Sequence, residues 1–195
     1  MDYYFPGESS SFILRGEEID STILSKHRSS QIESWLLEDG LYEDLELLYR
    51  GSRDGRKGSY FNDKCDNKGA TITAIQSTGG FIFGGFSDKI WTSSKGYCEY
   101  DKAFLFSLKS PANEVGPTKM RIMQNGCFYD MYYRSTYGPY FGDGHDLRIG
   151  IDANNNINSY SRLGHTYEIP PGQTNTFLVG SKNFKVSEIE VFQII

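Results

Sequence analysis

Hydrophobic residues recur at two different spacings along the chain, first with the period of a helix and then with that of short strands. The helical spacing is carried by three large side chains, Ile32, Trp35 and Leu36. Ser30 precedes Glu33 by three residues, as in a capping box, and Gly40 is placed to end the helix. We therefore predict a helix over about residues 28–38, with its apolar face in the core.

From residue 45 onward the apolar residues form short runs rich in β-branched and aromatic side chains. These runs occupy residues 45–51, 70–77, 81–86, 103–108, 119–124, 147–152 and 188–194. Turn-forming clusters separate them, and Phe61 and Cys65 are spaced for a short second helix within 61–69. The pattern favours one domain of β-rich α+β class, a two-sheet antiparallel β-sandwich flanked by short helices.

Four glycines stand among aromatic and β-branched residues in GGFIFGGFSDKIW, residues 79–91. A phosphate-binding loop needs a GxxxxGK[ST] or GxGxxG spacing next to a helix, and neither spacing occurs in this stretch. STGG instead lies between two alternating runs, which indicates a β-hairpin. Gly84 and Gly85 inside the second run are typical of a bulge or of a close approach by another backbone.

Composition and charge narrow the class of protein. The 195 residues include 14 Tyr, 13 Phe and 21 Gly, a balance that favours strands and turns. The formal net charge is −5, and acids and bases are interspersed without a basic stripe, so nucleic acid is not an expected partner. The sequence also lacks a basic region followed by an apolar run at its start, and an apolar stretch long enough for a membrane span. We therefore expect a cytoplasmic protein.

The cysteines allow a redox hypothesis. Cys65, Cys98 and Cys127 are odd in number and show no CxxC spacing, so free thiols in a reducing compartment are expected. Cys65 lies between Lys64 and Lys68 and is the thiol for which we predict a lowered pKa, hence a possible redox role. The alternative is a packed thiol without a role.

A glycine-rich loop within residues 141–152 contains side chains suited to acid–base or metal chemistry. Its candidate residues are Gly142, Asp143, Gly144, His145 and Asp146. The alternative is a loop that simply opens a strand, because no second ligand pair stands at a fixed spacing. A zinc site that joins His165 to Cys127 would depend on the fold alone.

The segment DANNNIN begins like a calcium loop, with oxygen donors at alternate positions. These donors are Asp152, Asn154 and Asn156. An EF-hand loop needs glycine at its sixth position and an acid at its twelfth, where this chain has Ile157 and Leu163. An asparagine-rich turn is the simpler interpretation, and a weak surface calcium site is the alternative. The expectation is therefore no cofactor, with calcium as the alternative.

Six motifs together resemble one known family. They are LELLYRGSRDG, FNDKCDNKGATITAI, FIFGGFSDKIW, KAFLFSL, FGDGHDLRIGID and NFKVSEIEVFQI, and they occur in the order found in TLDc domains, most like those of protists and fungi. The resemblance runs from about Ser25 to Ile195 and leaves residues 1–24 as an N-terminal extension that can add a strand. It implies two antiparallel sheets in a sandwich with flanking helices.

The resemblance also implies a function. TLDc relatives protect cells against oxidative stress, several bind the vacuolar proton-pumping ATPase, and no enzymatic mechanism is established for the family. A non-enzymatic interaction module is thus expected, held at a vacuolar or endosomal membrane through its protein partner. Asp54, Glu190 and the glycine-rich loop are the candidate contact residues. Glu190 is either a solvated strand residue or an acid held near that loop. The alternatives are a thiol redox sensor, an unrecognised enzyme, and a calcium- or carbohydrate-binding sandwich.

Overall fold

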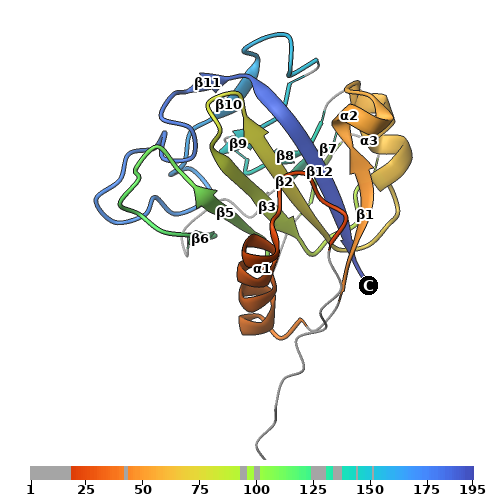
Figure 1. Cartoon of the computed structure of the whole chain (residues 1–195), viewed down its shortest axis with the longest axis horizontal. Coiled ribbons are helices and arrows are strands. Elements are labelled where there is room, and N and C mark those ends of the chain that lie inside the picture. Colours follow the sequence, from red (N-terminus) through yellow and green to blue (C-terminus); the bar gives the residue numbers. More distant parts are fainter. Residues whose placement is uncertain are drawn as a thin grey trace, which may run out of the picture.

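The computed structural model describes residues 19–41, 44–92, 96–98, 102–123, 131–133, 138–143, 145–150 and 152–195, with the backbone alone for 96–98 and 131–133. Within these residues the chain forms antiparallel sheets with short helices at their flanks (Figure 1). The predicted β-rich sandwich is therefore confirmed.

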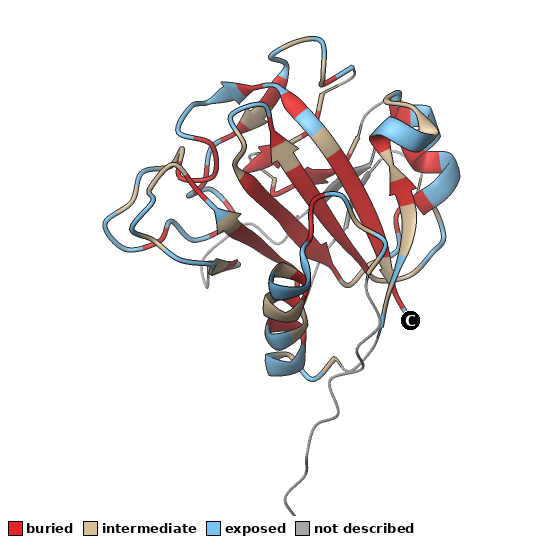
Figure 2. Ribbon diagram, in the orientation of Figure 1, coloured by how far each residue is buried: buried red, intermediate tan, exposed pale blue. Residues whose placement is uncertain are grey.

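The larger sheet has six strands in the order β1-β12-β2-β3-β5-β6, and every neighbouring pair is antiparallel. Its strands are β1 (Leu45–Arg50), β12 (Val186–Ile194), β2 (Thr71–Ser77), β3 (Ile82–Ser87), β5 (Phe104–Lys109) and β6 (Thr118–Arg121). The last strand in the sequence, β12, thus lies between the first two strands, β1 and β2. The C-terminal strand is therefore paired with the two strands that come first in the chain. Figure 2 shows that the central strands are buried along most of their length.

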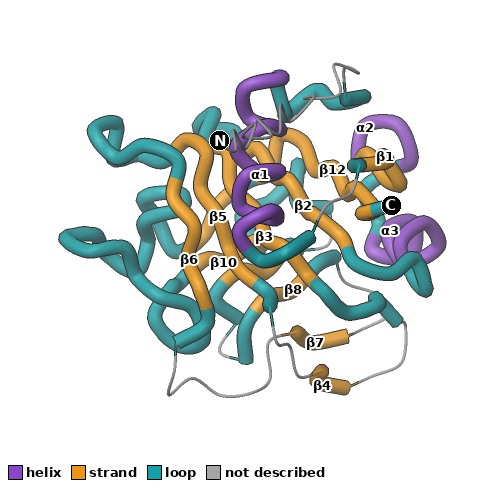
Figure 3. Tube along the Cα trace, turned by 90° about the horizontal axis from the view of Figure 1, so that it is seen from below, coloured by secondary structure: helices purple, strands orange, loops and turns teal. Residues whose placement is uncertain are grey.

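The second sheet has four short strands in the order β11-β10-β9-β8. These are β11 (Asn183–Phe184), β10 (Ser159–Ser161), β9 (Leu147–Arg148) and β8 (Tyr140–Phe141). A separate pair joins β4 (Gly96–Cys98) to β7 (Met131–Tyr133). The six-stranded sheet carries helix α1 (Lys26–Glu38) on one face and the four-stranded sheet on the other (Figure 3).

Two hydrophobic clusters fill the layers on either side of the six-stranded sheet. The α1 side contains Trp35 packed on Phe104 and Phe106, with ring centroids 6.5 and 6.1 Å away. The other side contains Trp91, whose ring meets Phe141 edge-on at 5.9 Å. The Trp91 indole N–H also donates to Thr71 Oγ1 at 2.7 Å, so its polar atom is satisfied inside the core.

Helix α1 begins two residues before the predicted start. Ser25, in extended conformation, is its N-cap, and the Ser25 carbonyl accepts the N–H groups of Arg28 and Ser29. Ser30 lies within the helix, so the predicted capping box is wrong. The reason is that buried side chains immediately before Ser25 already position the start of the helix. The end is as predicted: Gly40 has φ +78°, and the Leu41 N–H bonds back to the Leu36 carbonyl, as in a Schellman motif.

The glycine-rich stretch forms the predicted hairpin between β2 and β3. Ser77 and Phe81 close the turn, with Gly80 at φ +77°. Gly84 lies opposite Ala74, and a Cβ on Gly84 would stand 1.8 Å from the Thr73 carbonyl oxygen. Glycine is needed here because the neighbouring backbone comes too close for any side chain.

Two short helices follow β1. Helix α2 (Gly51–Asp54) comes directly after the strand, and α3 (Gly58–Cys65) covers part of the predicted 61–69 segment. The prediction placed this helix too late, since it ends at Cys65. Its buried residues include Phe61 and Cys65, as expected from their spacing. No helix within the described ranges is long and apolar enough to cross a membrane.

Candidate functional site

The candidate residues lie in separate places rather than in one cleft. Glu190 shares its face of β12 with Phe192, which packs in the α1 cluster, whereas Ile189 and Val191 belong to the opposite cluster. Asp146 precedes β9 of the four-stranded sheet, on that opposite side. Glu190 and the glycine-rich loop are therefore on opposite faces of the six-stranded sheet, and Glu190 is not part of the loop.

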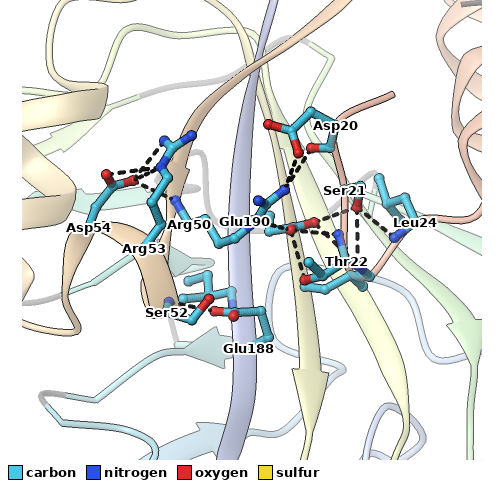
Figure 4. A network of polar contacts seen from close by, with 12 residues as sticks. Asp20, Ser21, Thr22, Leu24, Arg50, Ser52, Arg53, Asp54, Glu188 and Glu190 are labelled. Atoms are coloured by element: carbon cyan, nitrogen blue, oxygen red, sulfur yellow. Dashed lines mark hydrogen bonds and ion pairs between the residues drawn. The ribbon is translucent and has the colours of Figure 1, made fainter. Parts of the chain in front are cut away.

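Glu190 lies at the centre of a buried polar network between β1, β12 and the segment before α1 (Figure 4). Its side chain is fully inaccessible to solvent. Arg50 Nε pairs with Oε1 at 2.6 Å, and the Thr22 N–H and hydroxyl donate to the same oxygen at 2.9 and 3.0 Å. The Ser21 hydroxyl and the Ile23 N–H donate to Oε2. The solvated alternative for Glu190 is therefore wrong, because residues far away in sequence cover it.

The segment over Glu190 is built by local hydrogen bonds and apolar anchors. Ser21 Oγ accepts the N–H groups of Ile23 and Leu24 at 3.1 and 2.7 Å, which holds the segment in a turn. The Ile23 and Leu24 side chains are buried in the α1 cluster. Asp20 adds an exposed ion pair to Arg50 Nη2 at 2.7 Å. Residues 19–24 form no strand, yet they complete the enclosure of the Glu190 carboxylate.

Asp54 is bound at the outer edge of the same sheet. Its Oδ2 accepts the Arg50 N–H at 2.9 Å, and Arg53 pairs with both carboxylate oxygens at 2.8 to 3.1 Å. Arg53 also donates to the Leu48 carbonyl at 3.1 Å. The hydrogen bond from Arg53 holds the pKa of Asp54 below its ordinary value. Since β1 is the edge strand of this sheet within the described residues, this side-chain pair occupies two backbone groups that another strand could otherwise bind.

Glu188, which was not predicted as a site residue, connects β12 to α2. Its Oε1 accepts the N–H groups of Ser52 and Ile189, each at 3.0 Å, and Arg56 lies 3.8 Å away. The alternation of SEIEV indicated that Glu188 and Glu190 share a side of β12. What each carboxylate binds could not be read from that pattern, because the partners come from β1, α2 and residues 20–23.

In the glycine-rich loop, Asp146 is the organising residue. It is fully buried, and its carboxylate accepts the N–H groups of His165, Thr166 and Tyr167 at 3.1 to 3.2 Å. Burial raises the pKa of Asp146, and the three N–H donors offset part of that rise. Gly142 has φ +87°, and a Cβ there would stand 2.6 Å from Asp146 Oδ1. The loop is thus shaped around a carboxylate that is already occupied by peptide groups.

The other loop candidates lie at the margin of this arrangement. The Asp143 N–H donates to Thr166 Oγ1 at 3.0 Å, so the peptide rather than the carboxylate of Asp143 joins the loop to residue 166. His145 has φ +58° and packs its ring edge-on to Tyr140 at 5.2 Å. Gly144 lies outside the described residues. An acid–base pair in this loop remains a prediction.

Cys65 has a raised thiol pKa, whereas a lowered pKa was predicted. Its side chain is fully buried in the cluster on the far side from α1. Burial raises the pKa of the thiol, Asp66 and Asp54 raise it further, and Lys68 opposes this only in part. The predicted lowering is therefore wrong, because loss of solvent around the thiolate outweighs the nearby lysine. The Cys98 side chain and all of Cys127 lie outside the described residues.

We expect Cys65 to resist alkylation in the folded protein at a pH of about 8.5, where an ordinary thiol is half ionised. Labelling with iodoacetamide, followed by peptide mapping, should find the Cys65 peptide unmodified until denaturant is added. Labelling of Cys65 in the native protein at the rate of the unfolded chain would contradict the burial described above.

The asparagine-rich segment forms a turn held by its own groups. The Asp152 carbonyl accepts the Asn155 N–H and the Asn156 side-chain amide at 2.8 and 3.0 Å, and Asn156 Oδ1 accepts the Asn158 N–H. Asp152 has φ +49°, and the Asn154 amide donates to Asn155. Within the described part of the chain, no three His, Cys, Asp or Glu side chains gather as a metal site. Calcium binding by Asp152, Asn154 and Asn156 stays an untested prediction.

Comparison with known proteins shows to which family this chain is related. The family profile of the TLDc domain matches residues 18–195, which include the segment that covers Glu190. A stretch of 73 residues is 29% identical to the zebrafish (Danio rerio) protein named MTOR-associated protein MEAK7. That stretch is 37% of this chain and 16% of the zebrafish protein, so the two share only part of their lengths. Since the profile spans nearly the whole chain, the protein belongs to the TLDc domain family.

Proposed function

We propose that this chain is a non-enzymatic protein-interaction module that binds the vacuolar proton-pumping ATPase and thereby contributes to resistance against oxidative stress. One observation supports the non-enzymatic part above the others. Glu190, Asp54 and Asp146 were each predicted as site residues, and each carboxylate is hydrogen-bonded within the protein. Glu190 binds Arg50 and residues 21–23, Asp54 binds Arg53, and Asp146 binds three peptide N–H groups.

A general acid or base must reach the proton that it transfers. Glu190 and Asp146 are fully buried, and their oxygens already accept several hydrogen bonds from the protein. These carboxylates stabilise the positions of β12 and of the loop before β9, which favours a rigid body that presents surfaces to a partner. The thiol redox alternative loses its support at Cys65, because that thiol is buried and its pKa is raised.

The choice of partner rests on the family. Several TLDc relatives bind the proton pump, and this chain carries the family's ordered motifs from β1 to β12. The zebrafish relative is named for association with MTOR, which makes MTOR the second candidate partner. Attachment to the pump would hold the module at the cytoplasmic side of a vacuolar or endosomal membrane.

Affinity capture from two fractions tests the proposal. The tagged full chain is incubated with cytosol and with detergent-solubilised vacuolar membranes, and captured proteins are identified by mass spectrometry against a tag-only control. We expect pump subunits to be enriched from the membrane fraction and to compete with untagged chain. Recovery of an MTOR complex without pump subunits would overturn the partner, and absence of any competable protein would overturn the interaction module itself.

A further inference from the structure

Basic side chains that are scattered in the sequence meet on the four-stranded sheet. Tyr160 on β10 pairs with Arg148 on β9, and the Arg148 guanidinium lies 5.8 Å from the Tyr160 ring centre. Lys182, just before β11, places its ammonium 5.2 Å from the same ring. Tyr160 is therefore flanked by cations from two other segments, and we name the group formed by Arg148, Tyr160, Arg162, His165 and Lys182 the Tyr160 surface.

The alternation of β10 turns this group away from the core. Ser159 and Ser161 are fully buried, while Tyr160 between them is half-buried and Arg162 is exposed. Tyr160 and Arg162 are two residues apart and line one surface hollow together with His165, Ile169 and Asn175. The hollow and the flanking cations thus form one continuous, mostly polar surface.

The cations of this surface are largely unneutralised. Arg162 and Lys182 form no ion pair with any residue that the structure describes, and Arg148 donates only to the Asn158 carbonyl among these residues. Asp146, whose backbone carbonyl accepts the Arg162 N–H, is buried, and its carboxylate already accepts three peptide N–H groups. This local excess of positive charge stands on a protein whose formal net charge is −5.

Such a surface is complementary to carboxylates. Arg presents a planar fork that can bind a carboxylate through two parallel hydrogen bonds, and Tyr and Arg are enriched at the centres of protein interfaces. Local positive charge also focuses the field that attracts an anionic segment, even on an acidic protein. The Ile169 side chain and the Tyr160 ring in the hollow offer apolar contact for one side chain of that segment.

We propose that the Tyr160 surface binds an acidic segment of a protein partner. This inference rests on the proposed interaction function and assigns that function to one face of the molecule. Carboxylates of the segment would lie against Arg162, Lys182 and Arg148, and one apolar side chain would enter the hollow beside Tyr160.

Fluorescence anisotropy with a labelled peptide tests this directly. The probe is a Glu-rich peptide of about twelve residues with a central Leu, which when extended spans about 40 Å. A matched peptide with Gln in place of every Glu is the control. We expect the full chain to bind the Glu peptide, to bind the Gln peptide at least about tenfold more weakly, and to lose affinity as salt rises.

Two charge-reversal variants distinguish binding at the Tyr160 surface from a general effect of the protein's net charge. The double variant Arg162→Glu with Lys182→Glu is expected to weaken binding of the Glu peptide at least about tenfold. Lys64→Glu with Lys68→Glu changes the net charge equally at two exposed positions outside the surface, and should change affinity less than about twofold. All four side chains are exposed, so thermal unfolding should stay near that of the wild type and report that both variants are folded.

Four results would overturn the inference: no binding of the Glu peptide, equal binding of the Gln peptide, equal weakening by both double variants, or binding to phosphatidylserine vesicles in place of the peptide. The inference can fail while the proposed function survives. If the Arg162→Glu, Lys182→Glu variant still captures pump subunits as well as the wild type, the partner binds another face. If it captures none while the Lys64, Lys68 variant does, both proposals are supported together.

Discussion

Replacing Glu190 by Gln is expected to lower the free energy of unfolding by about 3–5 kcal/mol, the range found when one partner of a buried ion pair is removed. The amide keeps the shape of the side chain but withdraws the charge that faces Arg50, whose side chain is only 13% exposed. Both carboxylate oxygens accept hydrogen bonds from residues 21–23. The NH₂ group of the glutamine is itself a donor, so it would face N–H and O–H groups that act as donors to the carboxylate. Urea denaturation monitored by tryptophan fluorescence measures the change.

The matched control is Glu46→Gln, which makes the same chemical change at an exposed position of β1. That variant should stay within about 0.5 kcal/mol of the wild type. A second measurement follows the segment over Glu190 itself: trypsin should cut after Lys26 faster in Glu190→Gln than in the control, because the contacts that hold residues 21–23 are lost. Equal stability of the two variants would show that the buried carboxylate does not hold the segment.

Replacing Gly84 by Ala is expected to cost at least about 4 kcal/mol, an effect in the extreme range for single substitutions. The added Cβ would lie 1.8 Å from the Thr73 carbonyl oxygen and 2.8 Å from Phe106 Cζ. The first of these atoms belongs to the backbone of the paired strand β2, so it cannot move without breaking the pairing of two central strands. The measurement is the yield of soluble, cooperatively unfolding protein, followed by its denaturation midpoint.

Gly116→Ala provides the comparison, since nothing lies within 4 Å of the position that its Cβ would take. It should change the free energy of unfolding by less than about 1 kcal/mol. If Gly84→Ala proved as stable as Gly116→Ala, the close approach of β2 and β3 would have to be wrong.

The strands of the six-stranded sheet were predictable because each is long enough to show a pattern. Residues 71–77 and 82–87 are rich in β-branched and aromatic side chains, and the turn glycines between them mark the hairpin. The strands β8, β10 and β11 were not predicted. They contain two or three residues each, too few for any periodicity, and they form strands only because neighbouring segments pair with them.

The candidate site was predictable in its residues and not in its chemistry. Glu190 was selected together with Asp54, and both belong to one network through Arg50. The partners that bury Glu190 come from residues 21–23, some 167 to 169 positions away, and no local pattern signals such a contact. For Cys65 the local lysines suggested a lowered pKa, whereas packing removed the solvent that a thiolate needs.

The amino-acid pattern alone thus determined the class of fold, the place of the long strands and the glycines of the turns. These properties depend on the period of side chains along a strand and on backbone angles, both of which are local. Tertiary structure alone decided which carboxylates are buried, how the thiol ionises and how Arg148, Arg162 and Lys182 gather around Tyr160. These depend on solvent exclusion and on strand register, which join residues that are distant in sequence.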